Sequence, residues 1–366
     1  MNWNRRRFLT SAAIAAPAAS VALAAPAIAQ GKRTLQMVMS WPHDFPGLAS
    51  IAYNFRDFVN ELTDGQITVN VAAAGELVAP FEVFDAVGSG AADCYHSTPV
   101  YLTGQWQPSV FFAQVPFGMT AAEHLGWMYH GGGQEVQQKH FRELFNIVPF
   151  TAGQTGLQMA GWFNKEVNNL DDFRGLTIRL PGLGGEVMRR VGANAVLIPA
   201  QEIFPALQSG TIDATELQGP WLDSVNGFHQ YTKFYYAPGW QEVNSAGEIG
   251  INAETWDSLS PQHQAALRRA IEAANGINTG EWAYYNAQFF QTLIRDHKVD
   301  VRSFPDDVID ALVKTSADVV TELSTVDERG KEVHDSYMAY FQKALEYSVK
   351  IEVPFFRARA RQYEAL

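Results

Sequence analysis

The chain has 366 residues, of which 47% are hydrophobic and 18% charged, a composition typical of a globular protein long enough for two domains. Its formal net charge of −12 disfavours nucleic acid and anionic membranes as partners. The single cysteine, Cys94, excludes an internal disulfide and a cysteine-based zinc site, and its apolar neighbours predict a place in the core.

The N-terminal segment is typical of an export signal. The sequence NRRRFLT at residues 4–10 is basic with paired arginines, an alanine-rich apolar stretch follows, and the small-x-small sequence AIA ends at Ala29. These features predict that residues 1–29 form a twin-arginine signal peptide, which is cut after Ala29 and directs the protein to the periplasm. The alternative is an N-terminal membrane anchor, which is disfavoured because the apolar run is short and contains Pro17 and Pro26.

Strand and helix patterns alternate along the first two thirds of the chain that follows. Residues 35–40 predict a strand, residues 48–62 show apolar side chains at helical spacing, and residues 67–71 alternate as a strand. A short helix over 81–87 and a strand over 94–97 come next. Because this alternation continues to about residue 240, the expected class is α/β, with sheets covered by helices.

The last third predicts long helices. Residues 261 to about 294 and 305 to about 351 have helical patterns, and a short strand over 299–302 separates them. Near the end of the second helix, aromatic and apolar side chains recur at spacings of three and four residues: Tyr337, Tyr340, Phe341, Ala344, Leu345 and Tyr347. This stripe has two interpretations, which are packing on its own domain and a subunit interface.

Several short sequences resemble parts of catalytic motifs but lack the rest. HGGG at residues 130–133 is similar to the oxyanion loop of lipases, but the chain has no Gly-x-Ser-x-Gly elbow. GLGG at residues 182–185 starts like a dinucleotide-binding loop, but its third glycine would fall at Val187. The chain has no phosphate-binding loop and no His-Glu-x-x-His, and its nine histidines lack close metal-ligand spacing. We therefore expect a protein that is not an enzyme.

The segment from residue 154 to residue 216 carries the main binding prediction. Residues 177–180 predict a short strand that ends at Pro181, so Arg179 lies near a strand end, beside a glycine-rich turn where a ligand can approach the backbone. A guanidinium pairs with a carboxylate through two parallel hydrogen bonds and stays charged when it is desolvated. Arg179 is therefore a candidate carboxylate clamp, and a surface ion pair is the alternative.

Two motifs in this segment resemble the solute-binding proteins of TRAP transporters, the tripartite ATP-independent periplasmic family. LDDFRGLTIRLP at residues 170–181 is similar to the family's central motif, whose arginine clamps the substrate carboxylate, and ALQSGTIDATE at residues 206–216 is similar to its second motif. The likeness extends over nearly the whole mature chain. It implies a two-domain, periplasmic-binding-protein-like α/β fold with a ligand cleft between the domains, long C-terminal helices and no enzymatic activity.

Within this family the chain looks closest to the α-keto-acid-binding group, through YHGGG (129–133), QMAGWF (158–163), ATE (214–216) and YYAPGW (235–240). That group holds its ligand with a metal ion, and the resemblance carries the metal ligands to Gln158, Glu216 and the backbone carbonyl of Leu217. The group has tryptophan where this chain has Leu217, so the apolar wall beside the ligand is expected to differ. Amide, carboxylate and carbonyl oxygens suit Na⁺ or Ca²⁺ rather than zinc.

The same resemblance implies further residues in the cleft. Tyr101 is expected beside the ligand and Glu242 beside the metal, while Trp41 and Phe163 are expected to form apolar walls.

The resemblance also implies a domain layout. The first domain would comprise residues 30–153 and about 243–280, the second residues 154–242 and about 281–345, and residues 346–366 would form a C-terminal helical extension. Closure on the ligand would be a hinge motion between the two domains. The closed complex is expected to dock on the membrane permease subunits of a TRAP transporter. Pairing through the C-terminal helix in the α-keto-acid group favours a homodimer.

The predicted function is the capture of a small monocarboxylic 2-oxo or 2-hydroxy acid, similar to pyruvate or lactate, bridged by Na⁺ or Ca²⁺. Such an acid can chelate the cation through its carboxylate and the neighbouring oxygen, while Arg179 holds the carboxylate from the other side. The alternatives are an exported enzyme that acts on a carbonyl acid and a binding protein for a ligand that is not an acid.

Overall fold

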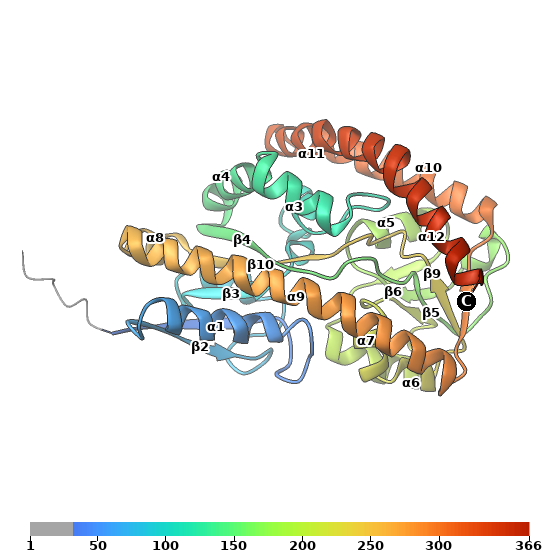
Figure 1. Cartoon of the computed structure of the whole chain (residues 1–366), viewed down its shortest axis with the longest axis horizontal. Helices are drawn as coiled ribbons and strands as arrows, with labels where there is room; N and C mark the ends of the chain where they lie inside the picture. Colours follow the sequence, from blue (N-terminus) through green and yellow to red (C-terminus); the bar gives the residue numbers. More distant parts are fainter. Residues whose placement is uncertain (1–31, 366) are drawn as a thin grey trace, which may run out of the picture. The chain divides into compact units, whose positions relative to one another are not determined.

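Two β-sheets organise the part of the chain that the structure describes. The computed structural model describes residues 32–365, and the predicted signal peptide lies outside this range. One sheet has five strands and the other has six. Helices cover both sheets (Figure 1), so the predicted α/β class is confirmed.

The first sheet takes most of its strands from the N-terminal part of the chain. Its strands are β1 (Arg33–Met39), β2 (Ile67–Ala72), β3 (Cys94–Ser97), β4 (Ile147–Gln154) and β10 (Ala246–Asn252), in the order β2-β1-β3-β10-β4. The first three pair in parallel, whereas β10 runs antiparallel to β3 and β4. The helices of this part are α1 (Ser50–Leu62), α2 (Val83–Gly88), α3 (Ala121–His130), α4 (Gly133–Phe145) and α8 (Ala253–Asp257). In α1, Ile51, Phe55 and Val59 recur every four residues and are buried, which explains the helix predicted there.

The second sheet comes from the middle of the chain and one later strand. Its strands are β5 (Gly161–Phe163), β6 (Thr177–Arg179), β7 (Asn194–Val196), β8 (Ala214–Thr215), β9 (Phe234–Ala237) and β11 (Asp300–Ser303), in the order β11-β9-β5-β8-β6-β7. Its helices are α5 (Gly182–Arg190), α6 (Ile203–Ser209), α7 (Pro220–Val225) and α10 (Asp306–Glu322). Short 3₁₀ turns complete both parts: η2 (Pro99–Leu102), η3 (Gln107–Phe112), η4 (Leu170–Phe173), η5 (Ala200–Glu202) and η6 (Phe228–Gln230).

One helix of 35 residues, α9 (Pro261–Arg295), runs past both sheets. It begins where the sequence predicts, because the Ser260 side chain accepts a hydrogen bond from the backbone nitrogen of His263 and Pro261 occupies the first turn. The helix packs against α1 and β4 and then against α7 (Figure 1). It is therefore a continuous element shared by the two halves of the molecule.

The helix predicted over 305–351 is wrong in one respect, because the structure breaks it. Its helix α10 is followed by the 3₁₀ turn η7 (Leu323–Thr325), and a new helix, α11 (Glu328–Tyr347), begins after it. The Asp327 side chain accepts a hydrogen bond from the backbone nitrogen of Gly330 at 2.6 Å, which caps the new helix. The chain then continues through the π-helical turn η8 (Ser348–Glu352) into α12 (Val353–Ala365).

The aromatic stripe at the end of α11 is buried in one part and exposed to solvent in another. Tyr337 is 2% exposed, and its hydroxyl accepts a hydrogen bond from the backbone nitrogen of Met119 at 3.0 Å, so this part packs on its own domain. Tyr347, by contrast, is 60% exposed. Apolar exposure continues beyond it into α12, where Phe355 and Phe356 are also exposed.

The chain passes from the first sheet to the second between β4 and β5, returns between β9 and β10, and crosses a third time through α9, between β10 and β11. Glycines with left-handed backbone angles border the first passage, with φ of +106° at Gly153 and +118° at Gly161. A Cβ atom at Gly161 would lie 2.5 Å from the carbonyl oxygen of Thr215, so no larger residue fits there. The local path of this segment is therefore closely constrained.

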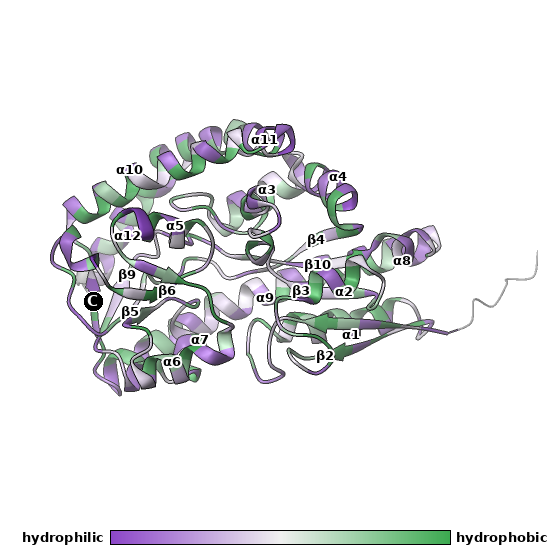
Figure 2. Ribbon diagram, turned by 180° about the vertical axis from the view of Figure 1, so that it is seen from behind, coloured by the Kyte–Doolittle hydropathy of each residue, from purple (hydrophilic) through white to green (hydrophobic). Residues whose placement is uncertain are grey.

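Apolar side chains are concentrated inside the structure. Every residue of β4 is buried, and Figure 2 shows the strands of the first sheet as mainly hydrophobic and α11 as mainly hydrophilic. Within residues 32–365, none of the helices has an apolar stretch long enough to cross a bilayer.

Candidate functional site

A cavity with a free volume of ≈ 30 Å³ lies between the two sheets. Its walls include Ala152 of β4 and Gly247 of β10 from the first sheet, and Arg179 of β6 and Pro181 from the second. A space of this size suits a ligand of few atoms. The predicted site residues Trp41, Tyr101, Arg179, Leu217 and Glu242 all line it.

Arg179 is held in place by backbone oxygens. The residue is 1% exposed and ends β6, just before Pro181. Its Nη1 donates to the carbonyl oxygen of Glu216 at 2.9 Å, and its Nε donates to the carbonyl oxygen of Ile198 at 3.3 Å. Neither bond neutralises its charge, so a buried cation faces the cavity and can receive a carboxylate.

Tyr101 and Trp41 form neighbouring parts of the wall. Their rings lie 5.9 Å apart, and Trp41 Nε1 donates to Nδ1 of His96 at 3.0 Å. The other ring nitrogen of His96 lies 3.2 Å from the carbonyl oxygen of Ala152, to which it donates. Burial lowers the pKa of His96 to about 4, so the ring is neutral and has one tautomer that satisfies both contacts. His96 therefore fixes the Trp41 wall.

Three side-chain oxygens meet beside the cavity. The side-chain oxygen of Gln158 lies 2.7 Å from Oε1 of Glu216 and 3.2 Å from Oε2 of Glu242. The amide nitrogen of Gln158 points the other way and donates to Thr155 Oγ1 and to Gln218 Oε1, both at 2.8 Å. Such a cluster is repulsive unless a cation or a carboxyl proton joins it.

Turning the Gln158 amide over would relieve its contacts with the two carboxylates but create another conflict. It would place the nitrogen beside the two carboxylates, but it would also set the Gln158 oxygen 2.8 Å from the side-chain oxygen of Gln218. Both orientations let the two hydrogens of the Gln158 amide donate, and both leave oxygens in contact: with Glu216 and Glu242 in the present one, and with Gln218 in the other. A hard cation among the three oxygens satisfies all of them, so the donor set fits Na⁺ or Ca²⁺.

The two carboxyl groups are buried and lack full compensation. Glu216 is 1% exposed and Glu242 is 2% exposed, and Oε2 of Glu216 has no hydrogen-bond partner among the described residues. Burial raises the pKa of Glu216 well above its ordinary value, and the neighbouring Glu242 raises it further. Burial also raises the pKa of Glu242, against the opposing effect of Arg179 and the hydrogen bond from Gln114. Two buried carboxyls with a single arginine beside them call for a cationic partner.

Leu217 follows Glu216 and lines the cavity with its side chain. Within residues 32–365, no hydrogen bond reaches its carbonyl oxygen, which leaves that oxygen available as a ligand. No group of three or more His, Cys, Asp or Glu side chains in the same range is arranged to hold a metal. The predicted cation site is of a different kind, because it combines an amide oxygen and a backbone carbonyl oxygen with only two carboxylates.

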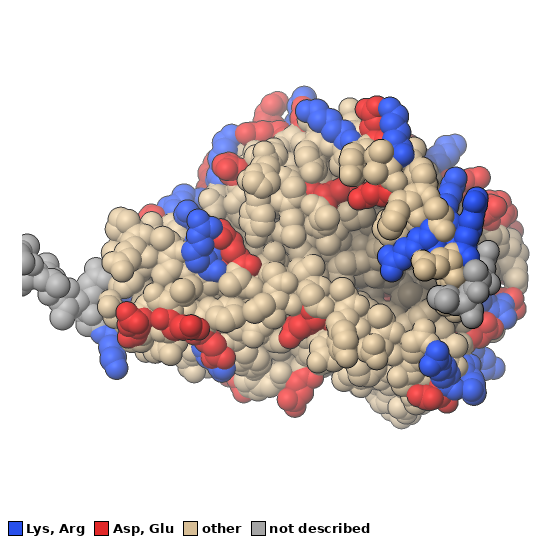
Figure 3. Space-filling view, in the orientation of Figure 1, with Lys and Arg blue, Asp and Glu red and all other residues tan. Residues whose placement is uncertain are grey.

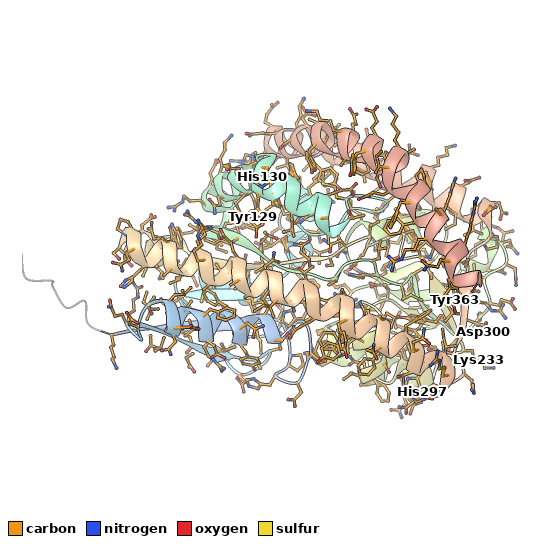
Figure 4. The ribbon with its side chains drawn as sticks, in the orientation of Figure 1. Tyr129, His130, Lys233, His297, Asp300 and Tyr363 are labelled. Atoms are coloured by element: carbon orange, nitrogen blue, oxygen red, sulfur yellow. The ribbon has the colours of Figure 1, made fainter. Side chains whose placement is uncertain are left out.

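Phe163 does not line the cavity, so the prediction that it forms part of the ligand wall is wrong. Its ring packs edge-on against Tyr236 at 5.2 Å and Phe304 at 5.9 Å, in the apolar core behind the second sheet. The short strand β5 fixes this direction, because consecutive side chains of a strand point to opposite faces. The YHGGG sequence also lies elsewhere: Figure 4 shows Tyr129 and His130 at the end of α3, and neither lines the cavity.

Several polar or aromatic cavity residues had no signal in the sequence. Thr155 and Gln218 contact Gln158, while Asn278 and Trp282 reach the cavity from α9, which lies far along the chain. Thr155 and Gln218 sit close to predicted ligands, and that proximity is the only feature that could have suggested them.

The match to a family model covers most of the chain. Residues 37–325 match bacterial extracellular solute-binding protein, family 7. The chain belongs to this family. A curated relative, the monocarboxylate 2-oxoacid-binding periplasmic protein of Nostoc sp., is 35% identical over 308 residues, which is 83% of each protein.

Solved structures of TRAP solute-binding proteins share this fold. A TRAP periplasmic solute-binding protein from Pseudoalteromonas atlantica, with bound sodium and pyruvate, has a TM-score of 0.86 and 31% identity, covering 89% of this chain and 99% of that one. A TRAP transporter solute-binding protein from Bordetella bronchiseptica, a mixed-occupancy dimer with copurified calcium and picolinate, has a TM-score of 0.87 and 30% identity, covering 91% and 99%.

These comparisons confirm several predictions. The chain has the two-domain fold of periplasmic binding proteins and is a TRAP solute-binding protein. Its family consists of periplasmic solute-binding proteins rather than enzymes, so the alternative of an exported enzyme is not supported.

Proposed function

We propose that this family 7 protein captures a small monocarboxylic 2-oxo or 2-hydroxy acid together with Na⁺ or Ca²⁺ and delivers the acid to a TRAP permease. The observation that carries the proposal is the set of three converging oxygens from Gln158, Glu216 and Glu242, beside a small cavity that Glu242 and Arg179 line. The Nostoc relative is named for 2-oxoacids, and the Pseudoalteromonas protein holds sodium and pyruvate, which supports the same ligand class here.

Each side chain has a separate role in this proposal. Arg179 binds the ligand carboxylate, and Tyr101 and Trp41 restrict its apolar end. Gln158, Glu216, Glu242 and the carbonyl of Leu217 hold the cation. The cation supplies positive charge to which a carboxylate and an adjacent oxo or hydroxyl oxygen can bind together. An acid without that second oxygen gains less, so the site prefers acids substituted at carbon 2.

We also propose that ligand binding closes a hinge. The supporting observation is that two chain passages, between β4 and β5 and between β9 and β10, connect the sheets whose residues form the cavity. The domains would be residues 30–153 with about 243–280, and residues 154–242 with about 281–345. Closure is favoured because only the closed form contacts the ligand from both sides. A smaller radius of gyration in solution scattering after ligand addition would support it, and an unchanged radius would contradict it.

Two further proposals concern location and assembly. Residues 1–29 would direct export by the twin-arginine route, which an export assay with Arg5→Lys and Arg6→Lys together would test by loss of the periplasmic form. The mature protein would form a homodimer through its C-terminal helices, because Tyr347, Phe355 and Phe356 are 60%, 58% and 57% exposed. The Bordetella relative is described as a dimer.

Thermal melting of ligand-free protein tests the ligand proposal. We expect pyruvate and lactate to raise the melting temperature, since a ligand at 100 times its Kd stabilises the folded state by about 2.7 kcal/mol. Acetate, which lacks the second oxygen, should have a much smaller effect. Chelation of Ca²⁺ combined with replacement of Na⁺ by choline should abolish the pyruvate effect.

Arg179→Lys provides the matched variant. Lysine keeps the charge but loses the planar pair of donors, so pyruvate affinity should fall by about tenfold or more. Arg174→Lys is the control, because Arg174 is exposed and pairs only with Asp171 at 3.1 Å. Equal stabilisation by acetate and pyruvate, or cation-independent binding, would overturn the proposal. Mass spectrometry of acid released from the purified protein would identify the bound compound.

A further inference from the structure

The amide of Gln158 has two supports on its nitrogen side. Its two N–H groups are both used, one by Thr155 Oγ1 and one by Gln218 Oε1, each at 2.8 Å. We infer that Thr155 and Gln218 are positioning residues, which hold the Gln158 amide so that its oxygen faces Glu216 and Glu242. The inference rests on the proposed cation-linked function of the same site.

Thr155 is itself held by the passage that returns the chain to the first sheet. Its hydroxyl accepts a second hydrogen bond from the backbone nitrogen of Ser245 at 2.9 Å and donates to the carbonyl oxygen of Gly156 at 3.2 Å. A hydroxyl has one hydrogen and two lone pairs, so these three bonds use its full capacity. The orientation of Gln158 therefore depends on the first two chain passages between the sheets.

Gln218 is anchored in the second domain. Its backbone nitrogen donates to Oδ1 of Asp223 at 3.3 Å, and the other carboxyl oxygen of Asp223 accepts from Tyr235 at 2.6 Å and from Trp162 at 3.0 Å. Tyr235 and Trp162 also stack with ring centroids 3.9 Å apart. The support on this side thus rests on a rigid buried group rather than on a mobile surface loop.

The two supports choose between two states of the amide. In the turned-over state the Gln158 nitrogen donates to the carboxylates at the 2.7 and 3.2 Å positions, but its oxygen meets Gln218 Oε1 and can accept from Thr155 only if that hydroxyl gives up its bond to Gly156. Loss of either side chain removes one of these costs. The turned-over state satisfies the glutamates without a cation, so it competes with cation binding. Residues that orient metal ligands typically change metal affinity by about 10- to 100-fold when they are replaced.

Calcium titration of the mature protein, freed of metal and acid, tests the inference. The probe is CaCl₂ at a fixed, high pyruvate concentration, followed by calorimetry. We expect Thr155→Val and Gln218→Met each to weaken Ca²⁺ binding by about tenfold or more, and Thr155→Ser, which keeps the hydroxyl, to stay within about threefold of the original protein. Thr232→Val is the control, since that buried hydroxyl donates only to the carbonyl oxygen of Phe228, at 2.8 Å.

A second readout separates positioning from general damage. Raising Ca²⁺ to saturation should recover most of the pyruvate affinity that the Thr155→Val and Gln218→Met proteins lose, because Arg179 is untouched, whereas general damage to the site would not be recovered. Unchanged Ca²⁺ affinity in both variants, or an equal loss in Thr232→Val, would overturn the inference. If the unaltered protein shows no dependence on Ca²⁺ or Na⁺, the proposed function fails instead. Gln218→Met decides the outcome if Thr155→Val does not fold, because it leaves the Thr155–Ser245 bond intact.

Discussion

At the scale of single residues, buried carboxyls set the response of stability to pH. Glu248 of β10 accepts hydrogen bonds from Tyr95 and from Gln137 of α4 and is 1% exposed. Burial raises the pKa of Glu248 to about 8, although both hydrogen bonds act in the opposite direction. The folded protein therefore keeps a proton that the unfolded chain releases near its ordinary pKa of 4.5.

The sign of this effect gives a prediction. Between about pH 4.5 and pH 8 the folded state binds more protons at Glu248 than the unfolded state, so the free energy of unfolding falls as pH rises. The glutamine of Glu248→Gln cannot ionise, so the free energy of unfolding of this variant should fall less steeply as pH rises. The two slopes should differ by up to about 1.4 kcal/mol per pH unit. Urea unfolding at pH 5, 6.5 and 8 measures the slopes. Parallel slopes for the variant and the original protein would contradict the prediction, and Glu61→Gln on the surface is the control.

The sequence predicted the residues of the site better than their supports. Arg179, Gln158, Glu216 and Glu242 are predicted from the resemblance; Arg179 and Glu242 line the cavity, and Gln158 and Glu216 lie beside Glu242. Thr155 was not predicted, because a single hydroxyl becomes significant only when folding sets it against the Gln158 amide. Phe163 was placed wrongly, because the direction of a side chain on a three-residue strand depends on which face the neighbouring helices cover.

At the scale of elements, local capping decides where helices end. The pattern over 305–351 reads as one helix because apolar spacing continues across the break. The structure starts α11 at Asp327, whose carboxylate caps the backbone of Gly330. The long helix α9, in contrast, was predicted well because Ser260 and Pro261 mark its start in the sequence itself.

The cap of α11 can be tested directly. Asp327→Ala removes the acceptor for the Gly330 nitrogen and should lower the free energy of unfolding by about 1 kcal/mol. Asp327→Ser keeps a capping oxygen and should recover most of that loss. The midpoint of urea unfolding measures both variants. Equal loss in Ala and Ser would show that the contacts of Asp327 with Trp106 and Arg329 matter more than the cap.

At the scale of the whole molecule, the C-terminal helix differs in charge from the rest. The chain is acidic, yet α12 carries Arg357, Arg359 and Arg361, and Figure 3 shows basic side chains gathered over that end of the molecule. The same helix exposes Phe355 and Phe356. The exposed aromatic rings are typical of an interface, and the basic side chains of α12 can pair with the acidic surface of another copy of this chain. Both features favour a second copy as the partner.

Light scattering of the mature protein tests this assembly. We expect a dimer for the original sequence and a monomer for the double variant Phe355→Asp with Phe356→Asp, because two buried charges would be costly at an interface. Leu77→Asp is the control, since Leu77 is 60% exposed on another part of the surface. A monomer for the original sequence, or a dimer for the double variant, would rule out this interface.

The glycines around the first passage between the sheets also bear on how such receptors diversify. Gly153 and Gly161 enclose the segment that carries Thr155 and Gln158, and neither position accepts a larger residue without strain or collision. Substitutions can accumulate at Leu217, Leu48 and Trp41, which form cavity wall without constraining the backbone in this way. Specificity for a new ligand can therefore evolve through substitutions in that wall, while the segment that carries the cation ligand stays unchanged. The same wall positions are the ones to alter when such a receptor is engineered as a biosensor.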